Sequence, residues 1–156
     1  MKTVEPQRFR DVMGRFATGV TVVTATGPDG PVGMTVNAVC SLSLEPLLVL
    51  VCFANSARTL RVVKATRRFG VNVLAEGQQE LAVMFASKTP EVTKFAGVRH
   101  SVHDGIPVIE GTLAWVGCRL EQLIPAGDHT IGIGAVTAAE IASTEPPLIW
   151  YRGEYR

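Results

Sequence analysis

The sequence predicts a single domain, residues 1–156, with a mainly β fold: an antiparallel barrel with a few peripheral helices. About six segments of strand length and composition are spread along the chain. The helical segments between them never alternate one for one with strands, which argues against a doubly wound parallel sheet. With 156 residues, 47% of them hydrophobic, the chain can bury a substantial core.

The N-terminal part predicts one helix and one strand. Pro6 begins the helix, because the N–H that proline lacks is not needed in the first turn. The helix carries one apolar stripe at helical spacing, formed by Phe9, Val12, Met13 and Phe16. Gly19 ends this segment, and the β-branched run 20–26 is a strand. Residues 27–31, rich in glycine and proline, form a turn into the next segment.

Residues 31–53, closed by the turn 54–56, form the central unit of the chain. Polar and apolar side chains alternate over most of 34–41, which is typical of a strand, and 47–53 is an apolar run of strand length. Such a unit offers backbone N–H groups and hydroxyls in front of an apolar wall. It suits a flat, partly polar aromatic ligand, and it equally suits an ordinary hairpin of a β-rich core.

The later elements follow from similar signals. Ser56 stands where an N-cap would begin a helix over 57–66. The remaining predicted elements are a strand at 69–74, a helix at 78–86, a mobile loop with a short helical piece at 87–99, and strands at 113–123, 130–142 and 147–151.

Composition excludes several classes of function. The formal net charge is +1 and the charges are dispersed, so we expect no nucleic acid partner. The longest apolar run, 47–54, is too short to cross a membrane, and no signal peptide is apparent. We therefore expect a cytoplasmic protein. The three cysteines, Cys40, Cys52 and Cys118, have no metal-binding spacing and are expected to be buried, reduced thiols.

Several catalytic motifs are absent. Gly132 and Gly134 lack the third glycine of a dinucleotide-binding fingerprint, so a nicotinamide nucleotide would bind without a Rossmann unit. His100 and His103, with Asp104 beside them, are the only local histidine pair. Glycine and proline crowd this segment, so we interpret it as a solvated loop and predict no metal site.

Residues 55–59 form a candidate phosphate site. A helix N-terminus presents free N–H groups and a partial positive charge. Ser56 and Thr59 add hydroxyls, and Arg58 adds a bidentate donor. The alternative is a plain helix start with surface residues.

Three segments together resemble the short-chain flavin reductases, the reductase components of two-component flavin-dependent monooxygenases. They are GMTVNAVCSLSLEPLLVLVC at 33–52, GDHT at 127–130 and LIWYRG at 148–153. The resemblance implies a split β-barrel, a Greek-key antiparallel barrel of the FMN-binding type, assembled as a homodimer. It also implies an NAD(P)H:flavin oxidoreductase that reduces FMN or FAD by hydride transfer and supplies reduced flavin to a partner monooxygenase.

The resemblance also assigns site residues. The flavin-binding residues that it implies are Thr35, Val36, Asn37, Ala38, Ser41, Ser43, Asn55, Ser56, Arg58 and Thr59. Phe85 either contacts the flavin ring or belongs to a helix core. His129, the catalytic residue, and Tyr151 are implied on the nicotinamide side, and Arg152 near a cofactor phosphate.

Some positions depart from the family pattern. Val39-Cys40 replaces the more usual aromatic–threonine pair, and Leu47 stands where a second proline is common. Gly132 replaces a larger side chain, which would leave more room beside the pocket. The choices between FMN and FAD and between NADH and NADPH stay open. The alternatives in function are a non-catalytic flavin- or haem-binding split-barrel carrier or sensor, and an oxidase-type relative that acts on a bound substrate.

Overall fold

The computed structural model describes residues 3–156. Its elements are α1 (Pro6–Met13), β1 (Thr18–Gly19), β2 (Thr21–Gly27), β3 (Gly30–Val36), β4 (Val39–Leu44), β5 (Leu47–Ala54), α2 (Arg58–Thr66), β6 (Arg68–Val73), α3 (Gln79–Ala86), α4 (Glu91–Ala96), β7 (His100–His103), β8 (Ile106–Ile109), β9 (Ala114–Ala126), β10 (His129–Ile141), β11 (Ile149–Tyr151) and β12 (Glu154–Tyr155). The predicted strands and helices are present, and most of their ends differ from the prediction by one to three residues. The first helix ends at Met13, six residues before Gly19, and the alternating stretch 34–41 is divided between β3 and β4.

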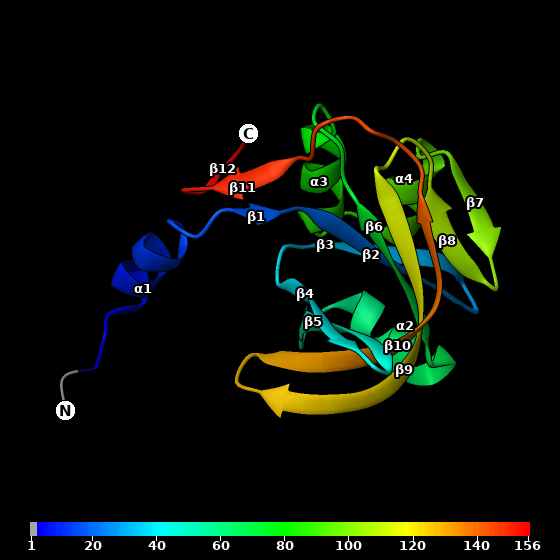
Figure 1. The fold of residues 1–156 in the computed structure, drawn as a ribbon, viewed down its shortest axis with the longest axis horizontal. Coiled ribbons are helices and arrows are strands. Elements are labelled where there is room, and N and C mark those ends of the chain that lie inside the picture. The colour runs from blue at the N-terminus through cyan, green and yellow to red at the C-terminus, as the bar shows by residue number, and fades with distance from the viewer. Residues whose placement is uncertain (1–2) are drawn as a thin grey trace.

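The main sheet has seven antiparallel strands in the order β3-β2-β6-β9-β10-β5-β4 (Figure 1). The predicted mainly β, antiparallel architecture is confirmed. The sheet is not closed into a barrel, because β3 and β4 are its two edges and no ladder joins them. The chain passes from β3 to β4 through Asn37 and Ala38, and β4 then pairs with β5 instead of returning to β3.

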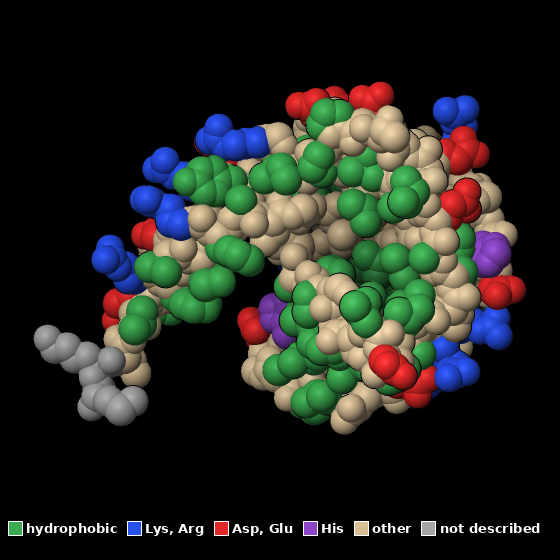
Figure 2. Space-filling model, viewed as in Figure 1, with side chains coloured by type: hydrophobic (Ala, Val, Ile, Leu, Met, Phe, Trp, Pro, Cys, Tyr) green, Lys and Arg blue, Asp and Glu red, His purple; other side chains and the backbone are tan. Residues whose placement is uncertain are grey.

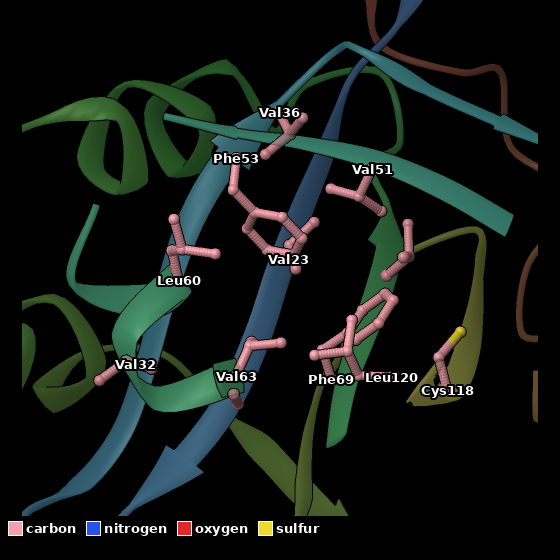
Figure 3. Packing of buried hydrophobic residues seen from close by; sticks show 12 residues of the cluster. Val23, Val32, Val36, Val51, Phe53, Leu60, Val63, Phe69, Cys118 and Leu120 are labelled. Carbon is pink, nitrogen blue, oxygen red and sulfur yellow. The ribbon is translucent and has the colours of Figure 1, made fainter. Parts of the chain in front are cut away.

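The curled sheet wraps around an apolar core that also takes in α2. Phe53 of β5 and Phe69 of β6 meet edge to face, with ring centroids 5.9 Å apart. Leu60 and Val63 of α2 point into the same cluster, as Figure 3 shows. Val36 of the edge strand β3 and Val51 of β5, which lies next to the other edge strand, are buried in this same cluster. Side-chain packing thus holds the two sides of the curled sheet together, where no backbone hydrogen bonds join β3 to β4.

Two glycines of β10 make this packing possible. A Cβ on Gly132 would lie 2.6 Å from Cε2 of Phe53, and one on Gly134 would lie 2.5 Å from Cζ of Phe69. The expectation that Gly132 leaves extra room beside the pocket is therefore wrong, because the Phe53 ring already fills that space. Both glycines are required by close approach and not by an unusual backbone conformation.

A second core lies between the sheet and helices α3 and α4. Phe85 of α3 and Phe95 of α4 pack edge to face at 5.0 Å, and both are buried. Beside them Asn72 of β6 is fully buried and satisfied: its amide donates to the carbonyl of Val22, and its oxygen accepts from the N–H of Ile109. This network attaches the β7–β8 hairpin to the sheet.

Two local predictions need correction. Residues 100–103 are not a loop, because β7 pairs with β8 across a tight turn at Asp104 and Gly105. The short helical piece predicted within 87–99 is present as α4. Cysteine burial is uneven: Cys118 is buried, which raises the pKa of its thiol to about 12, whereas Cys52 is half-buried and Cys40 is exposed.

Helix α1 begins at Pro6 as predicted, but no other element within residues 3–156 covers its apolar stripe. The helix projects from the body of the molecule beside β1 and β11 (Figure 1). The stripe residues Phe9, Val12, Met13 and Phe16 are 60, 56, 49 and 69% exposed. In Figure 2 hydrophobic side chains run along this arm. An amphipathic helix is stable in water only when its apolar face is covered, so this arm needs a further surface to pack on.

Within residues 3–156, no helix combines the length and the apolar character needed to span a membrane.

Candidate functional site

The site is centred on the corner between β3 and β4. Asn37 and Ala38 are exposed there, between Val36, which is buried, and Val39. The carbonyl of Ala38 accepts from the N–H of Cys52, 3.0 Å away, which fixes the corner against β5. The corner therefore presents a short stretch of exposed backbone on a rigid support.

Most side chains of the neighbouring predicted residues are already hydrogen-bonded within the protein and are less available to a ligand. The hydroxyl of Thr35 donates to the carbonyl of Ala82 at 2.6 Å, so it is engaged in holding α3. Ser43 accepts from the N–H of Glu45 at 3.2 Å, which shapes the turn after β4. Ser41 is exposed, and a register shift separates it from Ser43. At this end of the sheet, the backbone and the Ser41 hydroxyl are the groups that face outward.

The start of α2 lies just beyond the end of β5. The N-cap residue is Ala57 and no side chain caps the helix, so the prediction that Ser56 is the N-cap is wrong. Uncapped N–H groups of the first turn are free to bind an anion. Arg58 is exposed, whereas Thr59 is only 1% exposed and belongs to the core side of the helix. Of the two, the Arg58 side chain is the one available to a ligand.

Asn55 joins this helix start to the turn at 127–130. Its side-chain amide donates to the carbonyl of Gly127 at 3.1 Å, and its side-chain oxygen accepts from the hydroxyl of Thr130 at 2.7 Å. Its backbone N–H donates to the carbonyl of Asp128 at 3.0 Å. One residue thus connects two motifs that lie more than 70 positions apart in the sequence. Asn55 is a positioning residue for both.

His129 is the first residue of β10 and pairs with Ala54, the last residue of β5, so it lies at the end of these strands from which the chain enters α2. Its Nδ1 lies 2.7 Å from a carboxylate oxygen of Asp128, and its side chain is 45% exposed. The hydrogen bond from His129 lowers the pKa of the Asp128 carboxyl below its usual range. A carboxylate partner at Nδ1 places the N–H on that nitrogen and leaves Nε2 free to face a ligand.

Tyr151 and Arg152 lie on the other side of the corner. Tyr151 is the last residue of β11 and Arg152 comes directly after it. This strand belongs to a small sheet of order β1-β11-β12, in which Trp150 pairs with Thr18. The hydroxyl of Thr18 in turn accepts from the side-chain amide of Asn37 at 3.2 Å. The backbone N–H of Arg152 donates to the carbonyl of Gly14 at 2.8 Å. Hydrogen bonds thus link the small sheet and the residue after it to both the corner and the projecting arm.

The structure therefore brings most of the predicted residues around one corner. On one flank lie β5, the start of α2 and the turn at 127–130, and on the other lies the β1–β11 pair. Phe85 is 1% exposed and occupies the second core, so its position is that of the helix-core alternative. Sequence reasoning missed Thr18 and Thr130, which hold Asn37 and Asn55; no local motif marks a hydroxyl whose partner is distant in sequence.

Comparison with known proteins identifies the family. Residues 13–156 match the flavin reductase like domain. The reductase subunit HsaB of a flavin-dependent monooxygenase from Mycobacterium tuberculosis is 41% identical over 155 residues, which cover 97% of this chain and 82% of that protein. A flavin reductase (NADH) from Kitasatospora aureofaciens is 40% identical over 157 residues, 97% of this chain and 81% of that one.

A solved structure agrees. The NADH:FAD oxidoreductase SgcE6 of Streptomyces globisporus C-1027 superposes with a TM-score of 0.91 at 37% identity, over 100% of this chain and 96% of that one. The family match spans nearly the whole chain, including the corner, the start of α2 and the turn at 127–130. This chain belongs to the family of flavin reductase like domains.

Proposed function

We propose that this protein is an NAD(P)H:flavin oxidoreductase that reduces FMN or FAD and supplies the reduced flavin to a partner monooxygenase. The observation that carries the proposal is the corner at Asn37-Ala38. In a chain of this family, the exposed backbone of this corner lies at the same end of the strands as the uncapped start of α2 and His129. The relatives named as a flavin reductase (NADH) and as a monooxygenase reductase subunit support this reading over a non-catalytic carrier.

The residues present fit a flavin nucleotide. The free N–H groups of the first turn of α2 and the Arg58 guanidinium suit a phosphate. The backbone of residues 35–38 and the Ser41 hydroxyl suit the polar edge of a flavin ring, with the apolar face of β5 behind them. The Thr35 hydroxyl is already hydrogen-bonded and Thr59 is buried. Both residues would contribute by keeping the neighbouring backbone in position.

When both nucleotides are bound, the chemistry they supply is transfer of a hydride from nicotinamide C4 to flavin N5. The protein needs no nucleophile for this. Asn37 and Ala38 would orient one ring, and the flanks of the corner would exclude water around it. His129 would orient the nicotinamide through Nε2, held by Asp128. Tyr151 and Arg152 would border the nicotinamide nucleotide from the β11 side.

An absorption titration of the purified protein with FMN and FAD, followed by NADH under anaerobic conditions, tests the function. We expect a perturbed flavin spectrum on binding and bleaching of the oxidised flavin band when NADH is added. A bound flavin that stays oxidised under NADH and NADPH would instead favour the carrier or sensor.

His129→Ala is expected to lower kcat/KM for NADH by roughly five- to thirty-fold. One orienting hydrogen bond is worth on the order of 1–2 kcal/mol, which sets this range. Steady-state kinetics measure the change, and the Kd for FMN and the melting temperature should stay nearly constant. His103→Ala, in the exposed strand β7, is the matched control. A drop in melting temperature with normal NADH kinetics would show that His129 only stabilises its turn.

We further propose that the protein is a homodimer in which the arm of one copy packs on the other. The exposed stripe of α1 needs cover, and Leu44 and Leu47 at the β4–β5 turn are 82 and 53% exposed. A self-complementary pair of such surfaces is the usual way in which two identical chains bury them.

Light scattering at micromolar concentration is expected to give a dimer, and Phe9→Asp with Phe16→Asp is expected to give a monomer. Each charge would have to enter an apolar interface. Gln7→Ser, on the polar face of the same helix, is the control and should leave the dimer intact. A wild-type monomer with full reductase activity would contradict the assembly.

A further inference from the structure

Two of the three cysteines lie on the same face of the β4–β5 hairpin, beside the corner (Figure 1). Val39 of β4 pairs with Val51 of β5, and both side chains pack in the first core. Side chains alternate between the faces of a sheet, so the next residue of each strand, Cys40 and Cys52, is on the opposite face. Cys40 pairs with Leu50, two residues before Cys52. The two thiols are therefore diagonal neighbours across one strand pair.

The surroundings of the thiols set the order in which they react. Cys40 is exposed and Cys52 is half-buried, whereas Cys118 is buried in the core (Figure 3). Burial raises the pKa of the Cys52 thiol, and the charge of the neighbouring Cys40 thiolate raises it further. This influence of one thiol on the other agrees with their diagonal arrangement. An oxidant in solution reaches Cys40 most readily, and Cys52 is the thiol beside it.

A bond between the two sulfur atoms requires a movement of β4. Diagonal neighbours in an antiparallel pair have Cα atoms about 7–8 Å apart, and a disulfide needs about 4.4–6.8 Å. Because β4 is an edge strand, it can shift toward β5 without breaking a second ladder. A register shift after Ser41 already interrupts its pairing. Cys40 comes two residues after Ala38, so the same shift displaces the exposed backbone of the corner.

We propose that Cys40 and Cys52 form a redox site, at which hydrogen peroxide makes a disulfide that displaces the corner and inhibits the reductase. The proposal rests on the proposed function for its source of peroxide. Reduced flavin that no monooxygenase takes up gives two electrons and two protons to oxygen, which yields hydrogen peroxide. The site would thus lower flavin reduction when its product accumulates.

The chemistry has two steps. The Cys40 thiolate attacks one oxygen of the peroxide, the O–O bond breaks, and the released hydroxide takes up a proton and leaves as water. Cys40 is then a sulfenic acid. The Cys52 sulfur attacks the Cys40 sulfur, the S–O bond breaks, and the hydroxide leaves as water with the proton of Cys52. Two thiols lose two electrons and one peroxide becomes two waters. A dithiol reductant reverses the reaction by exchange.

The test oxidises the reduced wild-type protein with hydrogen peroxide and removes the excess with catalase. We expect a single chain lighter by two hydrogen atoms, with Cys40 and Cys52 in one disulfide-linked peptide pair. NADH oxidation with FMN should fall about tenfold or more, because a shift of about 1 Å at a positioning group has effects of this size. Dithiothreitol should restore both the mass and the rate.

Two variants separate the roles of the cysteines. Cys40→Thr restores the residue more usual in the family, so it should keep the activity of the untreated wild type and lose none of it to peroxide. Cys52→Ser retains Cys40 without its partner. After peroxide, it should carry a sulfenic acid that dimedone labels and no disulfide within the chain.

Three results would overturn the proposal: a disulfide between two chains or no disulfide at all, an equal loss of activity in Cys40→Thr, or a Cys40–Cys52 disulfide that leaves the rate unchanged. The intact mass and the disulfide map do not depend on activity. If the untreated protein reduces no flavin, the proposed function fails, and the map still decides whether the two cysteines form the bond.

Discussion

Ser56→Ala combined with Arg58→Ala is expected to weaken FMN binding at least tenfold. Losing one charge-assisted contact to the phosphate costs roughly 1.5–3 kcal/mol, which corresponds to a factor of ten or more in Kd. The Ser56 hydroxyl is exposed and caps no helix, and the Arg58 guanidinium is equally free. Riboflavin has no phosphate, so its Kd should barely change. Fluorescence titration of both flavins measures the two effects on one protein.

Lys64→Ala is the control for this pair. It removes a positive charge from the last turn of the same helix, outside the proposed phosphate site. It should leave both affinities unchanged, which separates a local contact from a general loss of charge. An equal loss of FMN and riboflavin affinity in the double variant would rule out the phosphate assignment.

Gly134→Ala is expected to destabilise the protein by about 1–3 kcal/mol, the usual cost of overpacking a core. The added Cβ would lie 2.5 Å from Cζ of Phe69 and 2.9 Å from the Cβ of Cys118. The Phe69 ring is fully buried and packs edge to face on Phe53, so a shift of this ring disturbs the core. For a chain of this size, the melting temperature should fall by roughly 2–12 °C.

A second substitution identifies the cause. Phe69→Leu removes the ring that an added Cβ meets, so Gly134→Ala should cost less in that background than in the wild type. Gly97→Ala is the control, because a Cβ there meets nothing within 4 Å. If the two core substitutions are additive, the contact with Phe69 is not the source of the instability.

The sequence predicts elements well wherever they are set by local pattern. The β-branched run of β2 and the apolar run of β5 identify those strands, and the apolar stripe identifies α1. The β7–β8 hairpin carried a signal too. Asp104-Gly105 is a strong hairpin dipeptide, and both residues have the positive φ that such a turn requires, 49° and 77°. The glycines and the proline nearby also favour a loop, so the composition of this segment masks the hairpin signal.

What the sequence misses depends on tertiary contacts. Helical periodicity shows that α1 has an apolar face but not whether its own chain covers it. Gly132 looks like missing bulk until Phe53 is seen to fill the space. Ser56 is a good capping residue, yet the chain enters α2 one residue later. The role of Asn55 is set by partners at 127–130, and no spacing rule connects such distant positions. The sequence thus indicates which motifs form the site but not what holds them together.

Steady-state NADH oxidation, measured with and without added flavin, tests whether this protein is a flavin reductase. We expect oxidation to be slow without flavin and to rise in a saturable manner with added FMN or FAD, while oxygen reoxidises the reduced product. His129→Ala should lower this rate at subsaturating NADH. A protein that binds flavin through the corner and α2, yet oxidises neither NADH nor NADPH at any flavin concentration, would not be a flavin reductase.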